Sequence, residues 1–374
     1  METLEQVSRI KTKINPFRPG SGLFPACLAG RSLDTELFSN KLYSTITGTP
    51  KNLLIYGDKQ MGKTSLLMQM ERIAEEKKAL TVSIISSPMD IKDFVMNLVI
   101  RLFSAVKYQE VPANGDLEEF VRDFQNASHD SIHATEIAFT DFIVHAWAYM
   151  KEYVPAIVFT VDDLDHIRDS EQALIILQNI TKKIYRDDCP IVFVITASAA
   201  FYEGIQKKNN DLIHYFEPVK VGRLQQSSCI NAVRVPLWEM DMAFDEAVIK
   251  EIARRSDGFP FYVQQIAHHV FEEAVAEVDT LALRRGYERA MQALEREIFI
   301  PLAASITPTE AQLYLVIFKN AGISFTDLLK HVRMPRGSVA SSLKRLKEKQ
   351  LIRQEKKMYS VQDRLFGAYL EKRV

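Results

Sequence analysis

Long uninterrupted apolar runs are absent from this sequence of 374 residues. No run approaches the roughly 20 residues that a membrane-spanning helix requires, and the first 17 residues are charged and contain no apolar core. We therefore expect neither a membrane span nor a signal peptide. Cysteine is also scarce: Cys27, Cys189 and Cys229 lie far apart and form no CxxC or Cys/His pattern. This usage favours reduced thiols in a cytoplasmic protein and excludes a cysteine-based metal site.

Net charge is nearly absent as well, at −1 for the whole chain. The balance is uneven, however, because residues 321–374 hold 13 Lys and Arg against 5 Asp and Glu, a net charge of +8 that leaves −9 for the remainder. With 47% hydrophobic residues the chain can build two or three cores. An acidic body joined to a basic C-terminal region is therefore expected.

A glycine-containing stretch follows the first apolar run. Residues 52–56 read NLLIY, which suits a buried parallel strand, and residues 64–74 repeat apolar side chains at helical spacing. Between them GDKQMGKT, residues 57–64, matches G-x-x-x-x-G-K-[ST] at every fixed position. The alternative is a turn that matches by chance, which the strand–loop–helix context disfavours. The stretch therefore predicts a phosphate-binding P-loop.

The residue types in this loop predict individual roles. Gly57 and Gly62 are expected to allow backbone conformations closed to other residues, so that successive N–H groups point at phosphate. Lys63 would reach the β- and γ-phosphates, and the Thr64 hydroxyl would ligate Mg²⁺. The start of the following helix adds partial positive charge. The remaining loop contacts to the nucleotide are expected from Asp58, Lys59, Gln60, Met61 and Ser65.

A second apolar strand supplies the acidic partner that a P-loop needs. Residues 156–161 read AIVFTV and end in Asp162 and Asp163. Asp162 is placed to hold Mg²⁺, and Asp163 is placed to polarise the attacking water. Because aspartate is shorter than the glutamate often found in that role, hydrolysis is expected to be slow. A solvated strand end is the alternative, and the P-loop upstream disfavours it.

A third strand, residues 190–198, ends in polar residues. Thr196 or Ser198 could sense the γ-phosphate, and an ordinary polar strand end is the alternative. The sequence contains no N-K-x-D motif for reading guanine, so adenine is the expected base. ATP or ADP with Mg²⁺ is the predicted cofactor.

Along the chain, apolar strands alternate with amphipathic helices and then give way to helices alone. Alternation of this kind predicts an α/β fold with a parallel sheet. An acidic, polar stretch at residues 108–120 is expected to form a surface loop. We predict four parts: an N-terminal arm and adenine-side segment (1–50), a P-loop α/β core (51–222), a helical lid (223–304) and a winged helix-turn-helix domain (305–374).

The winged-helix prediction comes from the order of elements in the last part. Residues 307–320, 324–332 and 335–350 read as helices, and residues 351–361 read as a hairpin. Expected DNA contacts lie off the apolar face of the third helix and at the hairpin tip: Arg336, Ser338, Ser341, Ser342, Arg345, Lys356 and Lys357. The alternative is a winged helix that docks on its own ATPase domain or on a partner protein.

The combination of motifs resembles the archaeal-type ATPases of the P-loop class, which lie near the STAND ATPases and the origin-recognition AAA+ ATPases. The segments that carry the resemblance are NPFRPG, AGR, GDKQMGKT, VFTVDDLD, VITAS, SDGFPFYVQQIA and the C-terminal winged helix. It covers nearly the whole chain and implies an ASCE/AAA+-like parallel sheet. It also implies that Arg31 lies by the adenine and that Pro260 packs against the nucleotide. For the segment around Pro260, an ordinary interhelical turn is the alternative.

The sequence departs from hexameric AAA+ motors. No arginine lies between the strand at 190–198 and the next strand, and the helix after Gly258 contains none; Arg254 and Arg255 precede that glycine. These departures favour a nucleotide-dependent switch that positions the winged helix, most simply on double-stranded DNA. The second interpretation is a STAND-like signalling or assembly ATPase, in which the winged helix contacts protein and ATP drives homo-oligomer formation. A third is a structural nucleotide that is barely hydrolysed.

Overall fold

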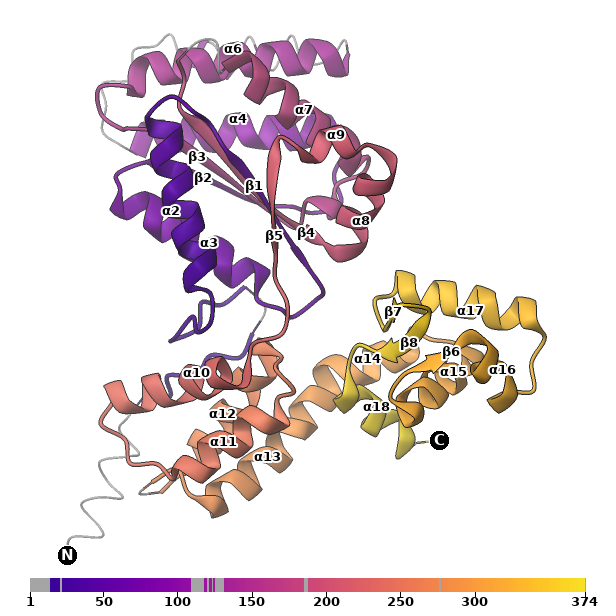
Figure 1. The fold of residues 1–374 in the computed structure, drawn as a ribbon. Coiled ribbons are helices and arrows are strands. Elements are labelled where there is room, and N and C mark those ends of the chain that lie inside the picture. The colour runs from indigo at the N-terminus through magenta and orange to yellow at the C-terminus, as the bar shows by residue number, and fades with distance from the viewer. Residues whose placement is uncertain are drawn as a thin grey trace, which may run out of the picture. The chain divides into compact units, whose positions relative to one another are not determined.

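The computed structural model describes residues 14–20, 22–108, 118, 119, 121, 122, 124, 131–184, 188–275 and 277–373. Contacts divide the chain into two compact units (Figure 1). One unit spans residues 28–222, and the other joins residues up to 27 with residues 223–374. The surface loop predicted at 108–120 falls almost entirely outside the described residues.

A five-stranded parallel sheet forms the centre of the 28–222 unit. Its order is β2-β3-β4-β1-β5, so β4 separates the two strands that carry the nucleotide motifs. The strands are β1 (Asn52–Gly57), β2 (Leu80–Ile85), β3 (Ile157–Asp162), β4 (Ile191–Ser198) and β5 (Phe216–Lys220). Gly57 pairs with Ser198 and Val161 with Ile195, so the carboxyl ends of β1, β3 and β4 meet at one edge of the sheet. Ligands bind at such an edge in parallel α/β sheets.

Helices cover both faces of this sheet, which explains why β3 is buried along its whole length. The chain crosses from β1 to β2 in one direction along the sheet and returns in the other. Because such crossovers are right-handed, α3 lies on the opposite face from α4, α6 and α7 (Figure 1). The helices are α2 (Ser32–Ile46), α3 (Lys63–Glu76), α4 (Ile91–Tyr108), α6 (Ile132–Met150), α7 (Ser170–Ile184), α8 (Ala199–Lys208) and α9 (Asn210–Ile213), with a 3₁₀ turn at Leu164–His166.

Five helices form the lid of the second unit. They are α10 (Gln226–Glu239), α11 (Glu246–Arg255), α12 (Pro260–Glu273), α13 (Thr280–Leu294) and α14 (Ile300–Ala304), and a π-helical turn, Glu295–Phe299, joins the last two. α12 and α13 pack at very close range, since a Cβ on Gly286 would lie 2.4 Å from Val270 Cα. The N-terminal arm is fixed to α12: Asn15 Nδ2 donates to the His268 carbonyl, and buried Phe17 packs edge-on against Phe271.

The remaining elements form the winged helix. They are α15 (Pro308–Asn320), β6 (Ile323–Ser324), α16 (Phe325–His331), α17 (Arg336–Glu348), β7 (Ile352–Glu355), β8 (Met358–Val361) and α18 (Arg364–Glu371). The three strands form an antiparallel sheet in the order β6-β8-β7. α15 begins with a reciprocal capping box between Thr307 and Glu310. Sequence analysis missed α18, although Asp363 caps it and its apolar residues recur at helical spacing.

Across the described residues, every helix is too short or too polar to cross a membrane.

Candidate nucleotide-binding site

The P-loop lies between the carboxyl end of β1 and the start of α3. Gln60 and Gly62 have φ values of 65° and 83°, a left-handed conformation that glycine adopts without a steric penalty. Gly57 has a different constraint, because a Cβ at this position would lie 2.1 Å from the Val221 carbonyl oxygen. The prediction that both glycines serve unusual backbone conformations is therefore right for Gly62 and wrong for Gly57, which is required by close packing.

Lys63 is the first residue of α3 and is held against the loop. Its Nζ donates to the carbonyl oxygens of Gly57 and Asp58, both at 3.1 Å, and the residue is only 9% exposed. The helix begins directly after Gly62 without a side-chain cap, so its first amides face the loop. A buried ammonium beside these amides makes an anion-binding cradle.

Two hydroxyl groups converge on the buried Asp162 carboxylate. Thr64 Oγ1 donates to Oδ2 at 2.8 Å, and Thr196 Oγ1 donates to Oδ1 at 2.6 Å. The three side chains come from α3, β3 and β4, and they meet because the strand ends align at this edge of the sheet. A threonine hydroxyl beside one carboxylate suits Mg²⁺, which takes few protein ligands and completes its shell with water and phosphate oxygens. Among the described residues no cluster of three or more His, Cys, Asp and Glu side chains offers a competing metal site.

Asp163 follows in a left-handed conformation, with φ 54°. Its amide donates to Thr196 Oγ1 at 2.7 Å, so Thr196 ties both aspartates to β4. Burial and then the neighbouring Asp162 raise the pKa of the Asp163 carboxyl, while Lys63 opposes that rise. A half-buried carboxyl of raised pKa beside the P-loop lysine suits the role of a base toward water.

The two polar residues at the end of β4 have different environments. Thr196 is completely buried between Asp162 and Asp163. Ser198 caps α8: its Oγ accepts from the Phe201 amide at 3.2 Å, and its own amide donates to Asp165. Of the two candidates, Thr196 is therefore the one that contacts the acidic pair, and sensing by Ser198 stays a prediction without a contact to support it.

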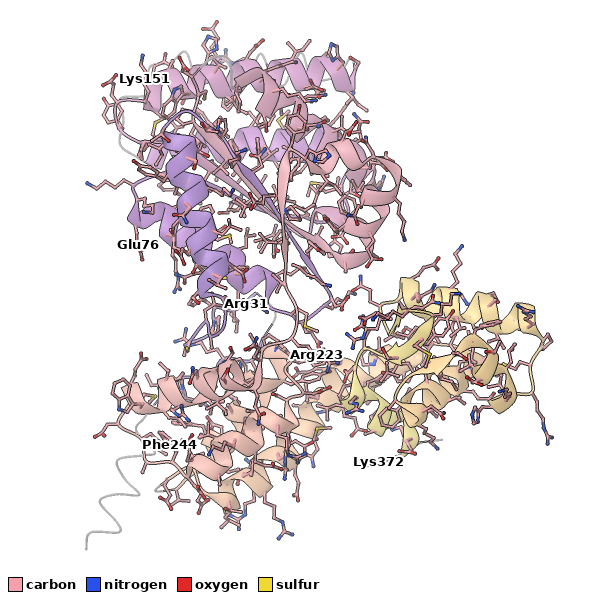
Figure 2. All side chains as sticks on the ribbon, viewed as in Figure 1. Arg31, Glu76, Lys151, Arg223, Phe244 and Lys372 are labelled. Carbon is pink, nitrogen blue, oxygen red and sulfur yellow. The ribbon has the colours of Figure 1, made fainter. Side chains whose placement is uncertain are left out.

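Arg31, labelled in Figure 2, links the P-loop to the segment that follows β5. Its guanidinium donates to the Met61 carbonyl at 3.1 Å and to the Gly222 carbonyl at 2.6 Å, and the residue is 9% exposed. Burial lowers the pKa of this guanidinium from its ordinary value, and the nearby Asp34 carboxylate offsets only part of that shift. The side chain thus fixes the loop backbone, and a contact with adenine stays a prediction.

Pro260 is the first residue of α12 and belongs to the other unit. It follows Gly258, whose φ is 77° and whose carbonyl accepts from the Leu224 amide at 2.8 Å. A Cβ on Gly258 would lie 2.8 Å from the Leu224 carbonyl oxygen, so the turn excludes other residues. The turn is thus tightly built, and its packing against nucleotide stays a prediction.

The turn at Gly258 is linked to the winged helix. Arg223 Nη1 bonds Asp257 Oδ2 at 2.8 Å, and Nη2 donates to the Gln362 carbonyl at 2.5 Å. Beside this link Tyr262 donates its hydroxyl to the Asp363 carboxylate. Sequence analysis missed this joint. The sequence carries only a weak signal for it, because the paired residues are 34, 139 and 101 positions apart and share no motif.

Helix α17, on which DNA contacts were predicted, only partly matches the prediction. Arg336, Ser338 and Ser341 are exposed, whereas Ser342 is 1% exposed. Placing Ser342 on the open face was wrong: it lies beside Leu343 and Leu346 in the direction of the core, since an α-helix turns 100° per residue.

Arg345 is partly exposed but has a partner inside the domain. Its Nε donates to Glu310 Oε1 at 2.6 Å, and Lys349 Nζ donates to Oε2 of the same carboxylate at 2.8 Å. Glu310 is fully buried. This network ties α17 to α15, so DNA contact by Arg345 stays a prediction that competes with an ion pair.

The hairpin tip agrees with the prediction. Lys356 and Lys357 are exposed and occupy the two-residue turn between β7 and β8, with φ values of 46° and 68°. Two consecutive left-handed residues are typical of a type I′ turn, which matches the twist of the strands. Both ammonium groups are therefore carried at the end of a wing.

Comparisons with known proteins support this architecture. A family model described as a probable winged helix domain matches residues 299–372. The fold is similar to that of a Walker-type ATPase of Pyrococcus abyssi (TM-score 0.67, 14% identity), with 95% of this chain and 98% of that chain covered. It is also similar to the ORC2 protein of Aeropyrum pernix in ADPNP–ADP complexes (TM-score 0.64, 12% identity), with 94% and 95% covered. No curated protein sequence matches the chain.

These likenesses establish the fold. The chain has an α/β P-loop core, a helical lid and a C-terminal winged helix, and its fold is similar to that of archaeal Walker-type and ORC ATPases. The predicted fold class and the resemblance to archaeal-type P-loop ATPases are confirmed.

Proposed function

We propose that this protein binds ATP with Mg²⁺, hydrolyses it slowly, and acts as a nucleotide-dependent switch that positions its winged helix on double-stranded DNA. The observation that carries the proposal is the convergence of Thr64 and Thr196 on Asp162, beside Lys63 and the P-loop. Two hydroxyl groups that donate to one buried carboxylate beside the P-loop lysine match the residue set of a Mg-nucleotide site.

The residues of the chain have distinct tasks in this proposal. The loop amides and Lys63 bind the phosphates. Thr64 and Asp162 would hold Mg²⁺, which supplies charge neutralisation of the phosphate oxygens when bound. Asp163 accepts a proton from water, and Thr196 fixes the orientation of both aspartates. The side chain of Asp163 is shorter than that of glutamate, which supports slow turnover.

The lid and its joint support the switching part of the proposal. The turn at Gly258 is bonded through Asp257 and Arg223 to Gln362 in the winged helix. A change of the turn on nucleotide binding would therefore act on the winged helix directly. The DNA surface consists of Arg336, Ser338 and Ser341 on α17 with the wing lysines, and the charge of +8 over residues 321–374 favours a polyanion.

The nucleotide half is tested by ATP turnover and by titration with a fluorescent ATP analogue. Lys63→Ala should abolish binding, and Asp163→Asn should lower turnover about 10²–10⁴-fold while binding persists. Turnover that is unchanged in Asp163→Asn would remove Asp163 as the base. Absence of turnover in the unchanged protein would leave a structural nucleotide as the function.

The DNA half is tested by fluorescence anisotropy with duplex DNA over a range of salt concentrations. Substituting Lys356 and Lys357 by Gln should lower the slope of log K against log salt by about 0.9 per lost phosphate contact. Unchanged binding would favour the STAND-like alternative. That alternative further requires oligomer formation with ATP and not with ADP, which size-exclusion with light scattering measures.

A further inference from the structure

A small cavity lies within the second unit, where the lid meets the winged helix. Its volume is about 200 Å³, and three arginines from separate elements line it: Arg223 after β5, Arg353 on β7 and Arg364 at the start of α18. Arg223 is labelled at this junction in Figure 2. The P-loop and the proposed DNA surface use none of these residues.

The cavity carries excess positive charge. Asp257 is the one carboxylate in its lining, which leaves a net charge of +2 against the three guanidinium groups. Asp257 is already paired with Arg223 at 2.8 Å. The excess therefore resides on Arg353 and Arg364.

These two arginines have few partners in the protein. Arg353 has a half-exposed side chain; its Nε donates to Ser360 Oγ at 3.1 Å, and its Nη1 forms an exposed ion pair with Glu355 at 3.7 Å. Arg364 is exposed, and within the described ranges of the chain its guanidinium makes neither a hydrogen bond nor an ion pair. Both guanidinium groups thus retain donors that can face the cavity.

The chemistry of the lining selects the ligand. A guanidinium presents its donors in a planar fork that matches phosphate oxygens. A phosphate monoester carries about −1.5 to −2 charge at neutral pH, close to the +2 of the cavity, whereas a DNA phosphodiester or a carboxylate carries −1. The Ser360 hydroxyl adds a further donor, and the aromatic ring of Phe318 supplies an apolar wall.

We propose that this cavity binds a phosphate dianion, either free or as the terminal group of a small molecule, at a site separate from the P-loop. The site includes Arg223, which also holds Asp257 and the Gln362 carbonyl. Binding there competes with Asp257 for the Arg223 guanidinium. The ligand consequently acts on the same joint that links the turn at Gly258 to the winged helix.

The test is isothermal titration of the full chain with inorganic phosphate, with chloride at matched ionic strength as the blank. Lys63→Ala serves as the background because it removes phosphate binding at the P-loop. One site is expected in this background. Arg364→Gln and Arg353→Gln should each weaken it about tenfold, the usual effect of losing one charged hydrogen-bonding group. Arg364→Lys keeps the charge without the fork and should give an intermediate affinity.

Arg333→Gln is the matched control, because Arg333 is an exposed winged-helix arginine outside the cavity. The proposal is overturned by an absence of binding at millimolar phosphate, by an equal loss in Arg333→Gln, or by displacement of phosphate by duplex DNA. Circular dichroism verifies folding of each variant. ATP turnover and DNA affinity of Arg364→Gln, measured with Lys63 intact, report separately on the proposed function, so failure of one proposal is distinguishable from failure of the other.

Discussion

Replacing Glu310 by Gln tests whether the basic residues of α17 stabilise the winged helix or only face a ligand. The Glu310 carboxylate is buried and accepts from Arg345 at 2.6 Å, from Lys349 at 2.8 Å and from the Thr307 amide at 3.0 Å. Glutamine keeps the shape and one acceptor but removes the charge. The substitution therefore removes the negative charge of the network together with one of its two acceptor atoms.

The magnitude follows from the pKa of Glu310. Burial raises this pKa, but the hydrogen bonds from Lys349, Arg345 and Thr307 outweigh burial and lower it from 4.5 to about 2. At 1.36 kcal/mol per unit this difference corresponds to about 3 kcal/mol in favour of the ionised form. Because the Arg345 and Lys349 side chains are 48% and 32% exposed, water screens part of it, and we expect a loss of about 2 kcal/mol.

The sign of the pH dependence is fixed by the lowered pKa. The contribution of Glu310 is complete above its ordinary pKa of 4.5 and is lost as the pH falls toward about 2. Stability of the unchanged winged helix should therefore decline through this window. In Glu310→Gln the decline should be smaller, and the stability at neutral pH should already be reduced.

Hydrogen exchange of α15 and α17 peptides in the full chain measures this local stability. Asp327→Asn is the control: Asp327 also pairs with a lysine, but both side chains are exposed, and little change is expected. Arg345→Gln should speed exchange as Glu310→Gln does and leave DNA affinity nearly unchanged, whereas Arg336→Gln should weaken DNA binding alone. Unaltered exchange in Glu310→Gln, together with lost DNA affinity in Arg345→Gln, would refute the structural role.

Three further predictions concern the nucleotide site. Gly57→Ala should reduce ADP affinity and melting temperature, because the alanine Cβ would lie 2.1 Å from a backbone oxygen. Gly204→Ala is the control: its Cβ would have no atom within 4 Å, so calorimetry should show a neutral or stabilising effect. Asp163→Asn should raise the melting temperature, since burial and Asp162 disfavour the charged carboxyl and raise its pKa, while turnover falls about 10²–10⁴-fold. Because that pKa is raised, turnover of the unchanged protein should fall on the acid side of it. Thr196→Val should slow turnover at least about tenfold and keep ADP binding, because it leaves the Asp163 amide without its acceptor and Asp162 Oδ1 without its donor, while Thr64 still donates to Oδ2. An unchanged rate would exclude Thr196 from the site.

Local sequence was sufficient for the motifs and for most elements. The P-loop is a contiguous strand, loop and helix, so GDKQMGKT predicts it without knowledge of distant residues. The acidic pair at the end of β3 is likewise read from one apolar run. The position of β4 between the two motif strands was not predicted and comes from the sheet itself.

Side-chain partners were predicted less well, because they depend on residues far away in the chain. Thr196 and Ser198 are two residues apart and share one face of β4, so the choice between them depends on the register that places Val161 opposite Ile195. Arg345 resembles a free surface arginine until Glu310, 35 positions earlier, is seen beside it.

The sequence by itself determined that this chain has a P-loop, an acidic partner and a basic winged helix, because each depends on residue types at short, fixed spacing. Only the tertiary structure decided which residues act together. In the packed structure the Val221 backbone lies so close to Gly57 that only glycine fits, and the Ser342 side chain is directed toward the core. Packing also places the Arg31 guanidinium at the Met61 and Gly222 carbonyls. It also joined the turn at Gly258 to the winged helix through Arg223, since hydrogen bonds act over about 3 Å however many residues separate their partners in sequence.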